Sequence, residues 1–315
     1  MFPVLHEFGS ATPDIRGARQ RTLKRSVSLS GIGVHTGAPA RLTLGRARAN
    51  TGVVFELRGS DEPLAAHWTN VVGTTLRTAL GNQDGSVVHT VEHLLAACAG
   101  LGLDNLRVRV EGPELPALDG SAAAFVAAID EAGYLDLPEW RATLKVLKPV
   151  RVQFGRSFAE FLPAECGLTL DIEIEFPEAV IGCQRKILTI DPGTLRRELM
   201  RARSFGFLRD LAPLQARGLA LGASLDNTIG LLDDAVLNPE GLRFPDECVR
   251  HKMLDALGDL ALAGAPITGV FRSYCGGHAL NIAALRALFS DASAFSFDGA
   301  RSRPQSQCGI SAAGR

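Results

Sequence analysis

Histidine and carboxylate side chains come together at two places in this 315-residue chain, and their types suit metal chemistry. Glu92 directly precedes His93, and His251 lies four residues before Asp255. Imidazole nitrogens and carboxylate oxygens both bind zinc at about 2.0–2.2 Å. A set of His93, His251 and Asp255 would leave a fourth position for water, and Glu92 beside it could take the water's proton. The same donors also suit Fe(II).

Two further segments carry groups that could act on a substrate. Gly276 and Gly277 permit a tight turn that presents His278 at the start of a helix. An imidazolium there could stabilise an oxyanion or protonate a leaving amine, and Asp259 could orient it. The hydroxyl of Ser204 could also donate a hydrogen bond to an oxyanion.

Each of these groups also has an ordinary structural explanation. Glu92 and His93 fit a solvated pair on a helix, and His251 and Asp255 fit an exposed i,i+4 pair. A loop histidine is a common helix cap, and the segment around Ser204 is typical of a turn with two buried phenylalanines. Single motifs leave both explanations open, so a decision needs several motifs at once.

The periodicity of apolar residues predicts the elements that must position these groups. A helix over 88–100 would place His89 and His93 on one face. Asp191 is placed to cap a later helix. The predicted helices are 88–100, 122–132, 193–201, 244–262 and 277–288, and the predicted strands are 26–35, 41–44, 52–57, 106–110, 144–154, 159–162, 168–176 and 267–271.

Both halves of the chain run from strands to helices, which indicates an α+β fold built from two similar units. The length fits two domains of roughly 150 residues each. We expect a first α+β domain over 21–140 and a second over 141–295. Residues 1–20 lack any apolar period, and we expect them and residues 296–315 to be mobile tails.

The composition excludes several classes of protein. Lys and Arg number 33 against 34 Asp and Glu, so the net charge of −1 gives no bulk attraction for nucleic acid. No apolar run reaches the roughly 18–20 residues of a membrane helix, and residues 1–26 lack the apolar core of a signal peptide. The six cysteines include no CxxC pair, which favours reduced thiols and a cytoplasmic location.

Six segments taken together resemble the UDP-3-O-acyl-N-acetylglucosamine deacetylases, the zinc amidases of lipid A synthesis in Gram-negative bacteria. The resemblance runs in order, with family-like spacing, from about residue 21 to about residue 288. The segments are SGIGVHTG at 30–37, TVEHLLAACAGLGLDN at 90–105, PALDGSA at 116–122, RSFGF at 203–207, RHKMLDALGD at 250–259 and GHALN at 277–281.

The resemblance implies a set of metal ligands, a general base and a charged histidine that stabilises the oxyanion. The matching positions are, in that order, His93, His251 and Asp255; Glu92; and His278 with Asp259 behind it. It also implies two similar domains, each a β-sheet packed against two helices, with the active site between them.

The resemblance assigns substrate contacts as well. Lys252 would hold the substrate near its phosphates, and Phe176, next to Glu175, would stack on uracil. Phe205 would also bind substrate. Ser204 occupies a position where the family usually has threonine. Serine keeps the hydroxyl but loses the methyl group that restricts the rotamers of threonine.

The family also has a β-α-β insertion in its second domain that forms a tunnel for the fatty acyl chain. In this chain the insertion corresponds to about residues 207–244. The apolar residues that could line the tunnel are Leu214, Leu219, Leu221, Leu225, Ile229, Leu231 and Leu232.

The implied function is metal-dependent hydrolysis of the N-acetyl group of UDP-3-O-(3-hydroxyacyl)-N-acetylglucosamine, the committed step of lipid A biosynthesis. The expected protein is a cytoplasmic monomer with Zn²⁺ or Fe²⁺ that binds a small acylated UDP-sugar, with no nucleic-acid partner and no integral membrane segment. An ionised Glu92 and a charged His278 would give a bell-shaped pH–rate profile. Two alternatives are another zinc-dependent N-acyl-sugar hydrolase on the same scaffold, and a non-catalytic module that binds a nucleotide sugar or an acyl chain.

Overall fold

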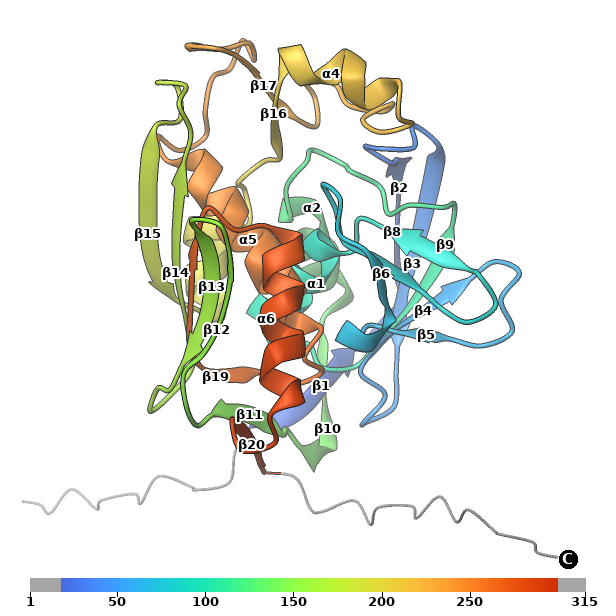
Figure 1. The fold of residues 1–315 in the computed structure, drawn as a ribbon. Coiled ribbons are helices and arrows are strands. Elements are labelled where there is room, and N and C mark those ends of the chain that lie inside the picture. The colour runs from blue at the N-terminus through green and yellow to red at the C-terminus, as the bar shows by residue number, and fades with distance from the viewer. Residues whose placement is uncertain (1–17, 300–315) are drawn as a thin grey trace, which may run out of the picture.

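The computed structural model describes residues 18–299, in which a layer of helices lies between two β-sheets (Figure 1). The central helices are α1 (Glu92–Leu101), α2 (Ala123–Ala132), α5 (Glu247–Ala261) and α6 (His278–Ser290). The first sheet has the order β2 (Val27–Ile32), β3 (Pro39–Arg46), β9 (Leu106–Glu111), β4 (Val53–Leu57) and β5 (Leu64–Ala65).

The second sheet comes from the second half of the chain. Its path is β12 (Val150–Phe154), β13 (Ser157–Leu162), β19 (Ile267–Tyr274), β11 (Thr143–Val146) and β20 (Phe295–Asp298). β14 (Leu168–Glu175) pairs in parallel with β19, and β15 (Cys183–Thr189) pairs with β14. The α+β class predicted from the sequence is confirmed, while the two domain boundaries stay a prediction.

Three small sheets and four short helical segments complete the fold. The sheets pair β1 (Arg19–Leu23) with β10 (Tyr134–Trp140), β6 (Val71–Gly73) with β7 (Ala79–Gly81) and β8 (Val87–His89), and β16 (Phe205–Phe207) with β17 (Ile229–Leu232) and β18 (Ala235–Val236). The helical segments are η1 (Trp68–Asn70), α3 (Pro192–Thr194), the π-helical η2 (Leu195–Leu199) and α4 (Leu208–Gln215).

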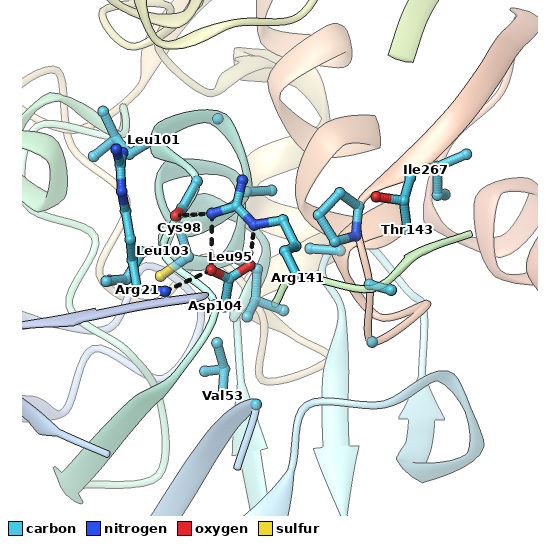
Figure 2. A pocket seen from close by; sticks show the side chains of 18 of the residues that line it. Arg21, Val53, Leu95, Cys98, Leu101, Leu103, Asp104, Arg141, Thr143 and Ile267 are labelled. Atoms are coloured by element: carbon cyan, nitrogen blue, oxygen red, sulfur yellow. Dashed lines mark hydrogen bonds and ion pairs between the residues drawn. The ribbon is translucent and has the colours of Figure 1, made fainter. Parts of the chain in front are cut away.

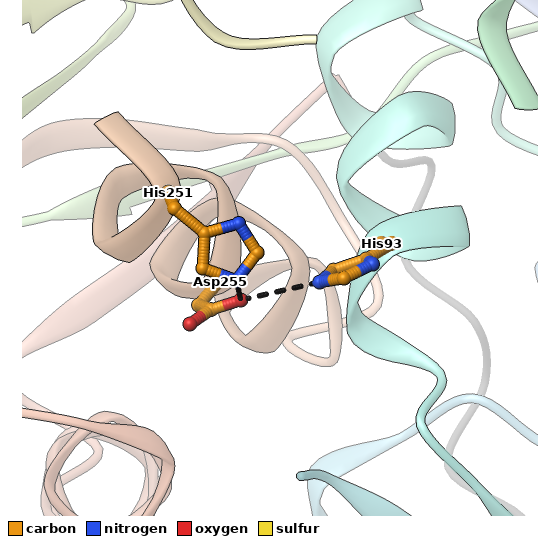
Figure 3. A group of neighbouring side chains, drawn as sticks. All are labelled: His93, His251 and Asp255. Carbon is orange, nitrogen blue, oxygen red and sulfur yellow. Dashed lines mark ion pairs between the residues drawn. The ribbon is translucent and has the colours of Figure 1, made fainter. Parts of the chain in front are cut away.

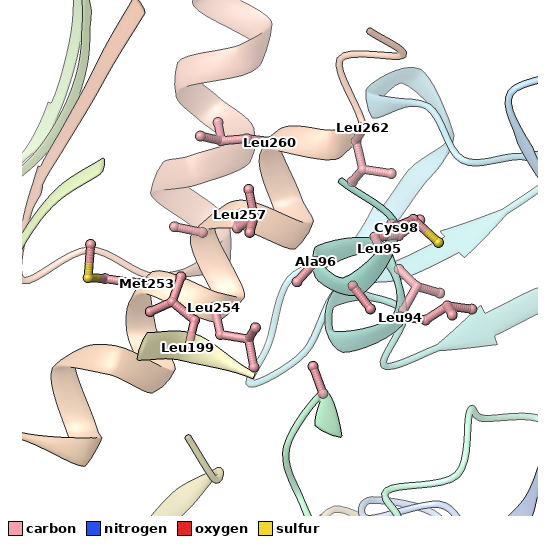
Figure 4. Packing of buried hydrophobic residues seen from close by; sticks show 14 of the residues in the cluster. Leu94, Leu95, Ala96, Cys98, Leu199, Met253, Leu254, Leu257, Leu260 and Leu262 are labelled. Carbon is pink, nitrogen blue, oxygen red and sulfur yellow. The ribbon is translucent and has the colours of Figure 1, made fainter. Parts of the chain in front are cut away.

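The contact between α1 and α5 forms the centre of the core. Nine of the ten residues of α1 are buried, which fits a helix that is apolar on all sides. The cluster includes Leu94 and Leu95 from α1 and Leu254 and Leu257 from α5 (Figure 4). This packing brings the first turn of α1 beside the middle of α5.

Gly258 allows the two helix backbones to touch. A Cβ atom at this position would lie 2.7 Å from the carbonyl carbon of Glu92 and 2.9 Å from its Cα. Distances below about 3 Å cannot be accommodated by moving a side chain, because both atoms belong to the backbone of α1. Glycine at 258 is therefore required for this approach.

An unusual backbone conformation sets the start of α1. Thr90 has φ +59°, which is rare for a β-branched residue. Its hydroxyl donates to Glu114 Oε1 at 2.6 Å, and the amide of Val91 donates to the carbonyl of Thr78 at 3.3 Å. These two contacts hold the strained turn and so fix where α1 begins.

Thr90 also explains why the predicted helix over 88–100 is wrong at its beginning. Its left-handed backbone separates β8, which ends at His89, from α1. His89 therefore does not share a helix face with His93. The predicted strand over 144–154 is likewise two strands, β11 and β12, with Pro149 in the gap between them.

Other predicted elements are confirmed within a few residues. The helices predicted over 122–132, 244–262 and 277–288 are α2, α5 and α6. Asp191 caps the helix predicted over 193–201, because its Oδ1 accepts from the amide of Thr194 at 2.8 Å. That helix begins as α3 and continues as the π-helical η2.

Both predicted tails prove shorter than expected. Arg19 and Gln20 belong to β1, and residues 296–298 belong to β20, which pairs antiparallel with β11. Residues 1–17 and 300–315 of the predicted tails lie outside the described residues. Among residues 18–299, no helix combines the length and the apolar character needed to cross a membrane.

The backbone contact at Gly258 leads to a stability prediction. Gly258→Ala should lower the free energy of unfolding by about 1–3 kcal/mol or more, the usual cost of overpacking a core. It should also weaken metal binding, since α1 carries His93. Urea denaturation measures the first effect, and metal titration measures the second. Gly45→Ala is the control, because its Cβ would meet atoms no closer than 3.6 Å. Equal stability of the two variants would contradict the interpretation.

Candidate metal centre and active site

Three of the predicted residues form a compact group between α1 and α5 (Figure 3). His93 comes from the first turn of α1, while His251 and Asp255 lie one turn apart on α5. Asp255 Oδ1 is 3.5 Å from His93 Nε2 and 3.3 Å from His251 Nε2. A tetrahedral metal with bonds of 2.0–2.2 Å would separate its ligand atoms by about 3.3–3.6 Å. The spacing therefore fits a metal ion.

The protonation of His251 also fits a metal ligand. Its Nδ1 lies 3.1 Å from the carbonyl oxygen of Ala202, which can only accept, so Nδ1 carries the proton and Nε2 offers a lone pair to the group. Burial, opposed by Asp255, lowers the pKa of His251 to about 3. The imidazole is thus neutral at ordinary pH, as a metal ligand must be.

Asp255 is held by a cation on its other oxygen. Lys252 Nζ donates to Oδ2 at 2.8 Å, which leaves Oδ1 facing the two histidines. Although burial opposes ionisation of Asp255, His251 and Lys252 bring its pKa well below the usual range. The carboxylate is therefore ionised and oriented without a metal present. Within the described part of the chain, His93, His251 and Asp255 are the one group of three such donors that meets metal spacing.

Glu92 and His278 face each other beside the metal group. Glu92 Oε1 lies 3.8 Å from His278 Nε2, and both side chains are buried. Burial raises the pKa of Glu92, although His278 and His93 oppose the shift. Burial also disfavours protonated His278, but Asp259 and Glu92 outweigh it and raise the pKa of His278 to about 9. The protonated form of His278 is therefore favoured, and it lies beside Glu92.

Asp259 fixes the imidazole of His278. Its Oδ2 lies 2.8 Å from His278 Nδ1 and accepts from Asn281 Nδ2 at the same distance. Its Oδ1 accepts from the hydroxyl of Thr78 at 2.6 Å. Since an ionised carboxylate only accepts, Nδ1 of His278 carries a proton and Nε2 points toward Glu92.

Two of the predicted substrate residues form an aromatic path away from the metal group. The ring of Phe205 lies 6.2 Å from that of His251, and the ring of Phe176 lies 5.9 Å from that of Phe205. Lys252 Nζ lies 5.6 Å from the centre of the Phe205 ring. Lys252, Phe205 and Phe176 are thus neighbours of the metal group in that order.

Ser204 and Glu175 form their hydrogen bonds with groups outside the metal group. The Ser204 hydroxyl donates to the carbonyl of Gly120 at 3.3 Å, a long bond for a hydroxyl donor. Glu175 is 42% exposed and accepts from Arg156 and from the hydroxyl of Tyr274. Its carboxylate is therefore held at the rim of the second sheet, next to Phe176 in sequence but bonded away from the metal group.

Around the predicted insertion at 207–244, β16 and β17 pair in parallel, and α4 lies between them in the chain. Since β16 covers Phe205–Phe207, the bounds of the insertion and its role as an acyl tunnel stay predictions. Among the residues predicted to line a tunnel, Leu219, Ile229 and Leu231 are buried. Three others lie on the surface with 43–51% exposure, namely Leu221, Leu225 and Leu232. The packing within the insertion is therefore looser than that of the central core.

His35 ties this insertion to the first half of the chain. Its Nδ1 accepts from the amide of Ala220 at 3.3 Å, and its carbonyl accepts from the amide of Leu221 at 3.0 Å. Burial lowers the pKa of His35 to about 4, so the ring is neutral and can accept. Glu114 holds the same loop by accepting from the amides of His35 and Thr36.

A separate cavity of about 800 Å³ lies at the far end of α1 and α5 (Figure 2). Cys98 near the end of α1 and Leu257 and Leu260 late in α5 line it, together with an ion pair between Arg141 and Asp104 at 2.7 Å. None of the predicted site residues lines this cavity. We therefore do not assign the chemistry to it.

Sequence reasoning missed three contributors to the site. Thr78 lies in a loop with no motif of its own, and the contribution of Ala202 is a backbone carbonyl, so neither left a signal. Asn281 was signalled, since it is one helical turn from His278 in the GHALN segment.

Comparison with known proteins identifies the family of the chain. A family model described as LpxC, UDP-3-O-acyl N-acetylglycosamine deacetylase, matches residues 20–290. Curated proteins named UDP-3-O-acyl-N-acetylglucosamine deacetylase from Brucella ovis, Brucella abortus and Brucella melitensis are each 48% identical over 281 residues. Each alignment covers 88% of this chain and 98% of the relative.

The metal group leads to a binding prediction. The protein should hold about one divalent metal per chain, with Zn²⁺ or Fe²⁺ suited to two imidazoles and one carboxylate. Changing a residue that only supports a metal ligand weakens metal binding by about 10–100-fold. His251→Ala removes a ligand itself and should weaken metal binding by more than that. Elemental analysis after dialysis measures the content. His67→Ala, which changes a histidine outside the group, should keep the metal; full retention in His251→Ala would refute the assignment.

Proposed function

This chain belongs to the family of UDP-3-O-acyl N-acetylglycosamine deacetylases, and we propose that it removes the N-acetyl group of UDP-3-O-(3-hydroxyacyl)-N-acetylglucosamine with a bound divalent metal. The reaction yields the free glucosamine amine and acetate and belongs to lipid A biosynthesis. The observation that carries the proposal is the buried pair of Glu92 and His278 beside three residues with metal spacing.

The proposed metal ligands are His93, His251 and Asp255. When bound there, the metal would supply a Lewis acid that polarises the acetamide carbonyl and lowers the pKa of the attacking water. Zn²⁺ is the proposed ion, and Fe²⁺ is the alternative that the same donors accept. The neutral state of His251 and the ionised state of Asp255 support this set.

Glu92 is the proposed general base. Its Oε2 accepts from the amide of Thr78 at 3.1 Å, so Oε1 is free to take the proton from water as the oxygen attacks the acetamide carbon. Burial raises the pKa of Glu92, which makes its carboxylate a stronger base than an exposed one.

His278 is proposed to hold a proton at Nε2 and to deliver it to the nitrogen as the carbon–nitrogen bond breaks. Asp259 keeps Nδ1 protonated and fixes the ring. The Ser204 hydroxyl can exchange its long bond to Gly120 for one to the developing oxyanion, because little binding energy is lost in the exchange.

Substrate contacts are proposed along the aromatic path. Burial lowers the pKa of Lys252, but Asp255 outweighs this effect and raises it. Lys252 is therefore a charged ammonium group that can attract the phosphates. Phe205 and Phe176 are proposed to contact the nucleotide, with Phe176 stacking on uracil and Glu175 acting at the rim. The apolar residues of the insertion are proposed to receive the acyl chain.

All of these groups come from one chain, and we propose that the protein acts as a monomer. Five of the six cysteines lie within the described residues and are free, namely Cys98, Cys166, Cys183, Cys248 and Cys275. Free thiols support a reducing compartment, and we propose the cytoplasm.

The test is a deacetylation assay on UDP-3-O-(3-hydroxyacyl)-N-acetylglucosamine, with mass spectrometry of the product. Chelation should stop the reaction and added Zn²⁺ should restore it. Glu92→Gln should lower kcat by about 10²–10⁴-fold while metal content stays near one, because the base is lost and the ligands remain. Acetylated sugars without the UDP group serve as controls. Equal turnover of these sugars would indicate a different N-acyl-sugar hydrolase, and metal-independent binding without turnover would indicate a binding module.

The pH dependence tests His278 separately. The imidazolium is the active form, so kcat should fall as pH rises through the pKa of His278. The groups that face this ring are Asp259, Glu92, Asp255 and the hydroxyl of Thr78. Asp259→Asn removes the main anionic partner and should therefore shift the basic limb to lower pH. Asp291→Asn, at an exposed site, should leave the limb in place. An unchanged limb in Asp259→Asn would remove His278 from this role.

A further inference from the structure

Thr78 contacts both Glu92 and the Asp259–His278 pair of the proposed catalytic site. It lies just before β7, in a loop that no sequence motif marked, and its side chain is fully buried. Leu76, two residues earlier, has φ +58°, in the left-handed region, so the chain turns just before Thr78. Through this turn the loop reaches both Glu92 on α1 and Asp259 on α5.

The hydroxyl of Thr78 has a defined direction. Asp259 Oδ1 at 2.6 Å can only accept, so the single hydroxyl proton points to it. The oxygen of the same hydroxyl lies 3.2 Å from His278 Nδ1, which already donates to Asp259 Oδ2. Thr78, Asp259 and His278 thus form a closed triangle of hydrogen-bonding groups.

The backbone of Thr78 acts on the base. Its amide donates to Glu92 Oε2 at 3.1 Å, and its carbonyl accepts from the amide of Val91, the residue before Glu92. One residue therefore selects which oxygen of Glu92 stays free and which oxygen of Asp259 is left for His278.

We propose that Thr78 is a positioning residue that links the general base Glu92 to the Asp259–His278 pair and holds their reactive atoms in register. The inference rests on the proposed function, which assigns Glu92 as the base and His278 as the acid. Thr78 touches neither the metal group nor the reacting atoms. It acts through the orientation of its neighbours, and its hydroxyl and its amide do so independently.

A purely structural role would give a different pattern. Thr194 offers a matched case, because it is also buried and its hydroxyl donates to a carboxylate, that of Asp191, at 2.9 Å. Thr194 lies on α3, outside the site. If Thr78 only contributed stability, the loss of either hydroxyl would have similar consequences.

The experiment compares Thr78→Val, Thr78→Ser and Thr194→Val in the full-length metal-loaded protein. Valine keeps the shape and the backbone amide but removes the hydroxyl, and serine keeps the hydroxyl. Deacetylation of the acylated UDP-sugar gives kcat and KM, and thermal unfolding and metal content report on structure. Histidine-selective ¹⁵N labelling gives the Nδ1–H resonance of His278, assigned by its loss in His278→Gln.

We expect Thr78→Val to lower kcat by about 10–100-fold with KM within about twofold, because orientation is lost and binding is kept. The Nδ1–H resonance should shift and exchange faster with water. Thr78→Ser should stay within about threefold of the unaltered protein. Thr194→Val should unfold at a temperature as low as Thr78→Val, with kcat and the resonance unchanged.

Equal kcat in Thr78→Val and the unaltered protein, or an equal loss in Thr194→Val, would overturn the inference. Loss of metal from Thr78→Val would also overturn it, since the role would then be structural. If the unaltered protein itself failed to deacetylate, the proposed function would fail. The Nδ1–H resonance of His278 would still decide whether Thr78 orients the imidazole, because the NMR measurement does not depend on turnover.

Discussion

The candidate site depends on one contact, the approach of α5 to the first residue of α1 at Gly258. The two helices supply the three metal-spaced donors and the proposed base, so their separation sets the distances from Glu92 and His93 on α1 to His251 and Asp255 on α5. Side-chain packing alone would leave that separation adjustable by some tenths of an ångström. A backbone-to-backbone contact has no such freedom, since neither partner has a rotamer to change. The strained turn at Thr90 then fixes the rotation and the starting point of α1.

The site concentrates three buried carboxylates, those of Glu92, Asp255 and Asp259. Isolated anions at such depth would be strongly unfavourable, so each needs compensation. Asp255 has Lys252, and Asp259 has the protonated His278 together with two neutral donors. Burial raises the pKa of Glu92 although His278 and His93 oppose the shift, so its carboxylate is inclined to take up a proton. The positive charge is therefore distributed unevenly. Asp259 is held as an anion that orients His278, Asp255 as an anion that can bind a metal, and Glu92 is left to accept a proton.

Much of this could be predicted from the sequence where local patterns carry the information. The pair His251 and Asp255 share a helix, so their spacing alone placed both on one face. His93 was proposed for the same group from its residue type, and the resemblance of several motifs supported it, but its position beside His251 and Asp255 depends on the packing of two distant helices. Thr78 could not be predicted, since a loop residue acquires its role only when α1 and α5 have met. The helix over 88–100 failed at Thr90 because a hydrogen bond to Glu114, 24 residues away, pays for a backbone conformation that local propensity disfavours.

The order of these residues along the chain has a consequence for biosynthesis. His93 and His251 are 158 residues apart. At the roughly 5–20 residues per second of translation, about 8–32 seconds separate their emergence. For that time α1 lacks α5, its main partner helix, and the part of its apolar surface that α5 covers in the finished protein is available to chaperones or to other nascent chains. The three proposed metal donors can come together only after α5 has left the ribosome, so a metal ion would bind after α1 and the first sheet have been synthesised.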